Sequence, residues 1–287
     1  RFYQIMILFL LSEKEISNMC TTSILIKKEC WGMKYIFFDI DGTLVSVKEG
    51  KEYIPESTLK TIQALQDKGH VTAIASGRSL LTVKPVAERL GIHYIVSDGG
   101  HGLMIRDQLI HVEPLDKQLV TRLCDELLEK KVPFAFMIDH SGKLHANSTM
   151  LCGQTQIGFE TFPIEINEAF DHRQNDAYKV FLGLHRGEED KIKTIDAHKI
   201  MRYVDECIAF EPDNKYKGVK ELVEMENGNI EDIIFFGDGQ NDIAMFKEVP
   251  FSIAMGNAID ELKSLAYYVT KSVDEDGIEY ACKHFNL

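Results

Sequence analysis

The chain has 287 residues, of which 45% are hydrophobic, and a formal net charge of −13 at pH 7. This length and composition exclude a wholly disordered protein and favour one large or two medium globular domains. The acidic balance, with no Lys/Arg cluster rising above it, argues against nucleic acid or an anionic membrane as a partner. An anionic ligand must therefore be attracted by local groups.

The six cysteines indicate neither a disulfide framework nor a structural zinc site. They are far apart, with no CxxC pair and no His at zinc-finger spacing. They are typical of core or incidental thiols in a reducing compartment, so a cytoplasmic location is expected. The cysteines are Cys20, Cys30, Cys124, Cys152, Cys207 and Cys282.

Residues 1–32 are expected to form an extension outside the functional fold. Their apolar run of seven residues, 5–11, is too short to span a bilayer and has no small-residue cleavage site after it. A membrane anchor is the alternative interpretation. Met33 directly precedes the first predicted strand, where a compact domain would begin.

From Met33 onward, short β-rich runs alternate with longer segments of helical spacing, the pattern of parallel βαβ units. The strands lack an alternating polar face, as expected when helices cover both sides of a sheet. The expected strands are 35–40, 70–76, 93–98, 232–237, 251–258 and 267–272, and the expected helices are 55–69, 80–90, 218–227 and 277–285.

The character of the sequence changes near Glu113. A helix at 114–131 is followed by strands joined by turns of hairpin length, one of them at Ser141 and Gly142. The sequence thus predicts an α/β protein with a Rossmann-like parallel sheet core, residues 33–113 and 211–287, and an inserted α+β domain at 114–210. The expected strands of the insert are 134–139, 143–148, 177–184 and 203–210.

Four aspartates follow two of the predicted core strands. Asp39 and Asp41 end the first strand, and Asp238 and Asp242 follow another. Ligands of open parallel sheets bind beyond the carboxyl ends of the strands, so the four side chains can converge there. Carboxylates gathered at one edge repel one another unless a cation neutralises them, and hard oxygen ligands suit Mg²⁺. The alternative is an ordinary Asp-Gly turn.

Other motifs with similar residues do not fit. An EF-hand loop counted from Asp39 would need Gly at its sixth position and Glu at its twelfth, where the chain has Leu44 and Gly50. A dinucleotide fingerprint starting at Gly237 would place Asp242 where its third glycine belongs, and no P-loop motif occurs.

Two further segments offer what an anionic substrate requires. Ser76 ends the second strand with Gly77 behind it, and together they offer a hydroxyl and backbone N–H groups to phosphate oxygens. Lys217 stands near the start of a predicted helix and offers a positive charge. Taken singly, Ser76 also fits a helix cap and Lys217 a solvated lysine.

The set of motifs resembles that of the haloacid dehalogenase-like (HAD) hydrolases. The large insert between the second and third motifs resembles the Cof-type sugar-phosphate phosphatases, which have a large α/β cap (class IIB). The resemblance covers Met33 to the C-terminus. Its motifs are DIDGT (39–43), SGR (76–78), KG (217–218), GDGQND (237–242), AMGNA (254–258) and DEDGI (274–278).

The resemblance implies an enzyme, a Mg²⁺-dependent phosphatase of small phosphorylated metabolites that works through an aspartyl-phosphate intermediate. Asp39 would be the nucleophile, and Asp41 would protonate the leaving group and then accept a proton from water. Alternatives are a phosphomutase, a biosynthetic sugar-phosphate phosphatase, or a non-catalytic regulator that binds phosphate esters. The implied Mg²⁺ ligands are Asp39, Asp41 (through its main-chain carbonyl), Asp238 and Asp242, and the implied phosphate-binding residues are Gly42, Ser76, Gly77, Lys217 and Asn241.

Two positions depart from the family pattern or leave a choice open. Asp98 stands where family members usually have Asn, and an extra acid near the phosphate could weaken affinity. The segment NKYKG has two lysines, of which Lys217 directly precedes Gly218 and Lys215 is the alternative. Substrate choice is expected to lie in the cap, and either a monomer or a homodimer is expected. The polar candidates in the cap, each of which fits a surface residue equally well, are His145, Asn147, Asp176 and Lys179.

Overall fold

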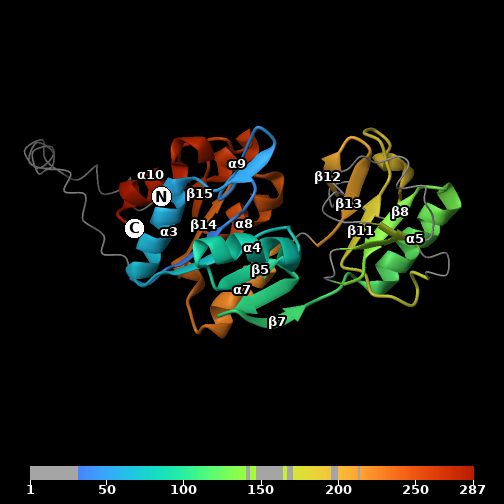
Figure 1. Cartoon of the computed structure of the whole chain (residues 1–287), viewed down its shortest axis with the longest axis horizontal. Coiled ribbons are helices and arrows are strands. Elements are labelled where there is room, and N and C mark those ends of the chain that lie inside the picture. Colours follow the sequence, from blue (N-terminus) through green and yellow to red (C-terminus); the bar gives the residue numbers. More distant parts are fainter. Residues whose placement is uncertain (1–31, 140–142, 147–163, 167–170, 195–199, 213) are drawn as a thin grey trace, which may run out of the picture.

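The computed structural model describes residues 32–139, 143–146, 164–166, 171–194, 200–212 and 214–287. The described part forms two lobes (Figure 1), each built around its own sheet. Several predictions lie outside these residues: the extension at 1–32 except for Gly32, the turn at 141–142, and the side chains of Cys20, Cys30, Cys152 and Asn147.

The larger lobe contains an eight-stranded sheet in the order β16-β15-β14-β1-β4-β5-β6-β7. The strands from β16 to β5 are parallel, and β6 and β7 continue the sheet in antiparallel fashion. Strand β1 lies between β14 and β4, at the centre of the parallel part. The strands are β1 (Tyr35–Phe38), β4 (Val71–Ala75), β5 (Tyr94–Ser97), β6 (Gly102–Ile105), β7 (Gln108–Val112), β14 (Ile233–Gly237), β15 (Phe251–Ala254) and β16 (Tyr268–Val269).

Helices cover both faces of this sheet. Alternate residues of β1 point to opposite faces, so Ile36 and Phe38 pack with α3, α4 and α10, whereas Tyr35 and Phe37 pack with α7, α8 and α9. This double burial explains why the strands read as continuous apolar runs. The helices are α3 (Glu56–Asp67), α4 (Leu80–Leu90), α7 (Lys215–Met225), α8 (Ile243–Glu248), α9 (Asp260–Leu265) and α10 (Gly277–Phe285).

The smaller lobe has a six-stranded sheet in the order β10-β9-β8-β11-β13-β12. One face packs on helix α5 through an apolar cluster that includes Leu123, Phe136 and Val180. The other face has a cluster of mainly smaller side chains, including Ala135 and Ala209. The elements are α5 (Lys117–Lys130), β8 (Phe134–Met137), β9 (Leu144–Ala146), β10 (Ile164–Ile166), β11 (Lys179–Leu182), β12 (Ile200–Val204) and β13 (Cys207–Phe210).

These findings confirm the predicted α/β class with a sheet core that is mainly parallel. The domain limits at 114 and 210 stay predictions. The strand expected at 203–210 is instead the end of β12, a turn and β13, which pair as an antiparallel hairpin.

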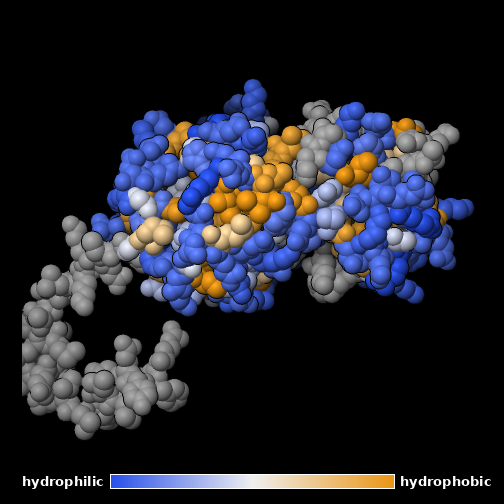
Figure 2. Space-filling view, turned by 90° about the horizontal axis from the view of Figure 1, so that it is seen from below, coloured by the Kyte–Doolittle hydropathy of each residue, from blue (hydrophilic) through white to orange (hydrophobic). Residues whose placement is uncertain are grey.

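Among the described residues, no helix is long and apolar enough to cross a bilayer. On the face shown in Figure 2, hydrophilic residues cover most of both lobes, and an apolar area lies near the middle of the larger one.

Two hairpins of the larger lobe were not predicted. In the first, β6 and β7 are joined by Arg106 and Asp107, and in the second, β2 (Ser46–Lys48) and β3 (Lys51–Tyr53) are joined by Glu49 and Gly50. All four turn residues have positive φ, as tight hairpin turns require. Three of them lack the glycine that usually marks this conformation, which explains the missed hairpins.

Candidate active site

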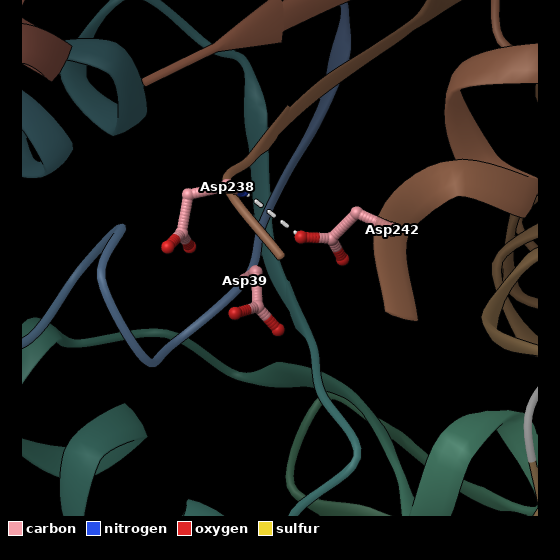
Figure 3. Close-up of side chains that lie close together, drawn as sticks. All are labelled: Asp39, Asp238 and Asp242. Carbon is pink, nitrogen blue, oxygen red and sulfur yellow. Dashed lines mark hydrogen bonds between the residues drawn. The ribbon is translucent and has the colours of Figure 1, made fainter. Parts of the chain in front are cut away.

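Three aspartates meet at the carboxyl edge of the central strands. Strands β1 and β14 pair in register, with Phe38 opposite Phe236, so the residues that follow them emerge side by side. The N–H of Asp39 donates to the carbonyl of Phe236 at 2.9 Å. One carboxylate oxygen from each of Asp39, Asp238 and Asp242 lies within 4.8 Å of the others, and Figure 3 shows the three groups turned toward a common space.

A buried lysine completes this group. The ammonium of Lys215 lies 2.6 Å from Oδ1 of Asp39 and 2.6 Å from Oδ1 of Asp242. Lys215 is 1% exposed and is the first residue of α7, whose preceding residue Asn214 accepts from the N–H of Lys217. The start of the helix thus directs Lys215 into the site.

The structure does not place Lys217, the lysine preferred from the sequence for phosphate binding, beside the aspartates. Lys217 is exposed and pairs with Glu113 at 2.5 Å. The helix begins at Lys215, three residues before the predicted start at Gly218, so the two lysines point in different directions. The alternative, Lys215, is the lysine that contacts the carboxylates.

The carboxylates outnumber the cation that faces them. Burial, followed by repulsion from Asp242, raises the pKa of Asp238 to about 7. Burial also raises the pKa of Asp39, although Lys215 opposes this. Burial disfavours the charged form of Lys215, but Asp242 and Asp39 outweigh it and raise the pKa of that lysine. Three buried or partly buried carboxylates against one ammonium leave a deficit of positive charge, which suits a divalent cation.

Asp238 is held from two sides by residues that the sequence did not single out. The hydroxyl of Thr43 donates to its Oδ1 at 2.9 Å, and the amide of Asn257 lies 3.3 Å from its Oδ2. The same amide donates to the carbonyl of Gly42 at 2.8 Å. Asn257 lies in the AMGNA segment, so the motif offered a signal. These bonds fix the orientation of the Asp238 carboxylate.

Gly42 allows this close approach. Its φ is +79°, and a Cβ at this position would lie 2.1 Å from Oδ2 of Asp238. Its N–H donates to the carbonyl of Val45 at 2.9 Å. The expectation that Gly42 binds phosphate therefore has no support from its N–H group, and the residue instead makes room for the Asp238 carboxylate.

Asp242 is buried and fully engaged by the chain. Its Oδ2 accepts from the N–H groups of Asp238 and Gly239, both at 3.0 Å, and its Oδ1 accepts from Lys215. It therefore shapes the loop after β14 and holds Lys215 in place.

The carboxylate of Asp41 is not part of the three-aspartate cluster and is held by an arginine. Oδ1 of Asp41 lies 2.5 Å from Nη2 of Arg78, and its Oδ2 accepts from Nε at 2.9 Å. The same Nη2 lies 2.5 Å from Glu52, which belongs to the β2–β3 hairpin. Neither Arg78 nor Glu52 was predicted as a site residue, although the third position of SGR is Arg78. This network fixes the direction of the Asp41 carboxylate.

The segment from Ser76 to Arg78, called the phosphate loop below because Ser76 and Gly77 are predicted to bind phosphate, lies beside the aspartates. Ser76 is 2% exposed, and its hydroxyl oxygen accepts from the N–H of Arg78 at 3.2 Å while retaining its own proton as a donor. A Cβ on Gly77 would lie 3.8 Å from Nδ2 of Asn241, and one on Gly239 would lie 2.6 Å from its Oδ1. The side chain of Asn241 therefore lies between the segment 76–78 and the segment 237–239, and its contact with phosphate stays a prediction.

Among the four polar candidates of the smaller lobe, Lys179 is the one placed at this loop. Its ammonium donates to the carbonyl of Gly77 at 2.7 Å. Asp176 is exposed and lies 3.5 Å from Lys117. His145 lies opposite Phe136 in the β8–β9 pair. Asn147 lies outside the described residues.

Asp98, the departure from the family pattern, is a buried residue with a φ of +50°. Its Oδ2 accepts from the N–H of Leu80 at 3.1 Å and from the hydroxyl of Ser97 at 2.8 Å. Oδ2 is therefore directed to the start of α4, whereas Oδ1 is buried and accepts no hydrogen bond from the described residues.

Comparison with known proteins shows the family of the chain. A family model described as haloacid dehalogenase-like hydrolase matches residues 36–281. A Bacillus subtilis protein named "Putative phosphatase YkrA" is 36% identical over 260 residues, covering 88% of this chain and 98% of that protein. The 5-amino-6-(5-phospho-D-ribitylamino)uracil phosphatase YwtE of the same organism is 30% identical, covering 86% of this chain and 96% of that protein.

The solved structure of the HAD subclass IIB sugar phosphatase BT4131 is also similar, with a TM-score of 0.71 and 27% identity, covering 88% of this chain and 99% of that one. The chain therefore belongs to the haloacid dehalogenase-like hydrolases. The predicted assignment to the Cof-type group is confirmed as well, and the relatives support a phosphatase enzyme.

Proposed function

We propose that the chain is a Mg²⁺-dependent phosphatase of small phosphorylated metabolites, most directly of sugar or polyol phosphates. The observation that carries the proposal is the convergence of Asp39, Asp238 and Asp242 on one buried lysine at the end of the central strands. The group combines a nucleophile, cation ligands and a fixed positive charge. These are the parts that attack on a phosphate dianion requires.

In the proposed reaction, a carboxylate oxygen of Asp39 attacks phosphorus, and the bond from phosphorus to the ester oxygen breaks. Asp41 gives its proton to the leaving alkoxide. Asp41 then takes a proton from water, whose oxygen attacks the phosphorus of the aspartyl-phosphate and releases phosphate and free Asp39. Lys215 neutralises charge on Asp39, and Ser76 donates its hydroxyl proton to the phosphoryl oxygens.

The donor set fits Mg²⁺. Asp39 and Asp238 would hold the ion together with the main-chain carbonyl of Asp41, while Asp242 would act directly or through water. A bound Mg²⁺ would supply the positive charge that lets one anion approach another. The raised pKa of Asp238, about 7, and the lack of a second buried cation in the described cluster support this assignment.

Removal of the ion is expected to abolish turnover without unfolding the chain. Phosphate release should fall to background when EDTA is present and return when Mg²⁺ is added in excess. Turnover that is undiminished after exhaustive chelation would contradict the proposed metal dependence. Helices pack on both faces of the central sheet without any contribution from the ion. The circular dichroism spectrum should therefore stay unchanged.

Replacement of Asp41 tests its role as the proton donor. Asp41→Asn should lower turnover of alkyl phosphates by about 10²-fold to 10⁴-fold, but turnover of an activated aryl phosphate much less, because a good leaving group needs no proton. The measurement is the ratio of kcat values for the two esters in the variant and the wild type. Equal losses on both esters would contradict the assignment.

The substrate is proposed from the kind of ester that relatives act on. The names of YwtE and BT4131 refer to a phosphorylated ribityl compound and to sugar phosphates, respectively. A screen of phosphate release should include hexose, pentose and polyol phosphates, with flavin mononucleotide and pyridoxal phosphate as further candidates. A hexose phosphate that yields an isomeric phosphate instead of free phosphate would favour a mutase.

The lobe around β8–β13 is proposed to act as the cap that closes over the site and contacts the leaving group. A cytoplasmic location and a monomer or homodimer stay predictions from the sequence.

A further inference from the structure

Lys179 begins β11 in the smaller lobe. Alternation along this strand places Val180 and Leu182 in the cluster against α5, and Lys179 with Phe181 on the opposite face of the sheet. Lys179 is nevertheless 3% exposed. Among the described residues, no helix of this lobe packs on that face, so the buried Lys179 must be covered by another part of the chain.

The covering groups come from the larger lobe and the connection to it. The ammonium of Lys179 lies 2.7 Å from the carbonyl oxygen of Gly77 and 2.7 Å from Oε2 of Glu211, which directly follows β13. Glu211 is also buried, and its Oε1 would lie 3.5 Å from a Cβ on Gly77. Lys179, Glu211 and Gly77 thus form one compact contact between the smaller lobe and the phosphate loop.

This contact acts on a specific peptide group. The carbonyl of Gly77 belongs to the peptide whose N–H, that of Arg78, donates to the hydroxyl oxygen of Ser76 at 3.2 Å. A charged donor on the carbonyl fixes the peptide plane and polarises its N–H, which strengthens the bond at the other end. The orientation of the Ser76 hydroxyl therefore depends on Lys179.

We propose that Lys179 is a positioning residue for phosphate binding: by its bond to the Gly77 carbonyl, it makes the affinity of the phosphate loop depend on the docked smaller lobe. The proposal rests on the proposed phosphatase function of the same site. It differs from the sequence expectation, in which Lys179 was one of four polar candidates for substrate choice or else a surface residue. The charge of Lys179 is neutralised by Glu211. Lys179 acts on the loop that binds the phosphoryl group, so its effect on affinity should be the same for every phosphate ester.

The two roles predict different inhibition by inorganic phosphate, which has no leaving group. If Lys179 positions the loop, Lys179→Met should weaken competitive inhibition by phosphate about tenfold or more and raise KM for an alkyl and an aryl ester by a similar factor. If Lys179 contacts the leaving group, KM should rise in an ester-dependent way while inhibition by phosphate is unchanged. The latter result would overturn the proposal, as would no change in either constant.

Loss of a buried charge can unfold a chain, so a second variant is needed. The double variant Lys179→Met with Glu211→Gln leaves neither charge unpaired and should fold as the wild type does. It should keep the weakened inhibition by phosphate, because the donor to Gly77 is still missing. A double variant that regains wild-type inhibition would show that the unpaired Glu211, and not the lost bond, weakened phosphate binding, and would overturn the proposal.

Lys117→Met is the matched control. Lys117 lies in the same lobe, at the start of α5, and pairs with the exposed Asp176. Its loss should change neither KM nor inhibition by phosphate. A failure of the wild-type chain to hydrolyse any phosphate ester would count against the proposed function. The Lys179 inference fails instead when hydrolysis is present and either the single variant responds to phosphate as the wild type does or the double variant regains wild-type inhibition.

Discussion

Asp39→Asn is expected to abolish phosphatase turnover, with a loss of about four orders of magnitude or more, while the chain stays folded. The substitution removes the attacking anion but keeps the shape of the side chain. Burial raises the pKa of Asp39, so its ionised form destabilises the native state once the pH exceeds the usual pKa of an aspartate. The neutral amide should therefore leave the thermal midpoint unchanged or slightly higher in the absence of metal.

The measurement is the steady-state release of phosphate from an alkyl ester, with differential scanning calorimetry for stability. Asp67→Asn is the matched control, because Asp67 is exposed at the end of α3. It should leave turnover unchanged. Substantial activity in Asp39→Asn would remove Asp39 as the nucleophile and, with it, the proposed intermediate.

Lys215→Met is expected to lower both turnover and stability. It leaves the buried carboxylates of Asp39 and Asp242 without their shared cation, a loss of about 3 to 5 kcal/mol in the free energy of unfolding. Turnover should fall by about 10²-fold to 10³-fold, because the positive charge beside the nucleophile is gone. Added Mg²⁺ should restore part of the stability but little of the turnover.

Lys217→Met provides the comparison, since the two lysines are two residues apart on one helix. Lys217 and Glu113 are both 45% exposed, and such an exposed pair contributes about 0 to 1 kcal/mol. Both turnover and the denaturant midpoint should stay close to wild type. The reverse result, with Lys217 essential and Lys215 dispensable, would contradict the geometry of the site.

Much of the site could be predicted because strand direction alone brings distant residues together. Asp39 and Asp238 were identified from apolar runs that end in acids, and the parallel pairing of β1 with β14 places them as expected. The preference for Lys217 came from its position directly before Gly218, and that pattern does not show which lysine faces the aspartates. Lys215 and Lys217 are the first and third residues of α7, so they lie on different sides of the helix.

The residues that orient the aspartates could not be predicted from the sequence. Arg78, Glu52 and Thr43 act through contacts between segments whose relative positions no periodicity reveals. The hairpin that contains Glu52 was hidden as well, because its turn residue Glu49 adopts positive φ without being glycine. Asn257 belongs to the AMGNA motif, but the sequence did not indicate its role. Its bonds to Gly42 and Asp238 show that it orients the Asp238 carboxylate.

The central position of β1 has a consequence for the chain during its synthesis. Its partners are β4, made soon after it, and β14, made almost two hundred residues later. Until β14 arrives, one side of Tyr35–Phe38 is an open apolar edge that invites pairing with another nascent chain. A product released near residue 210 would carry the nucleophile yet remain inert, and we expect it to aggregate.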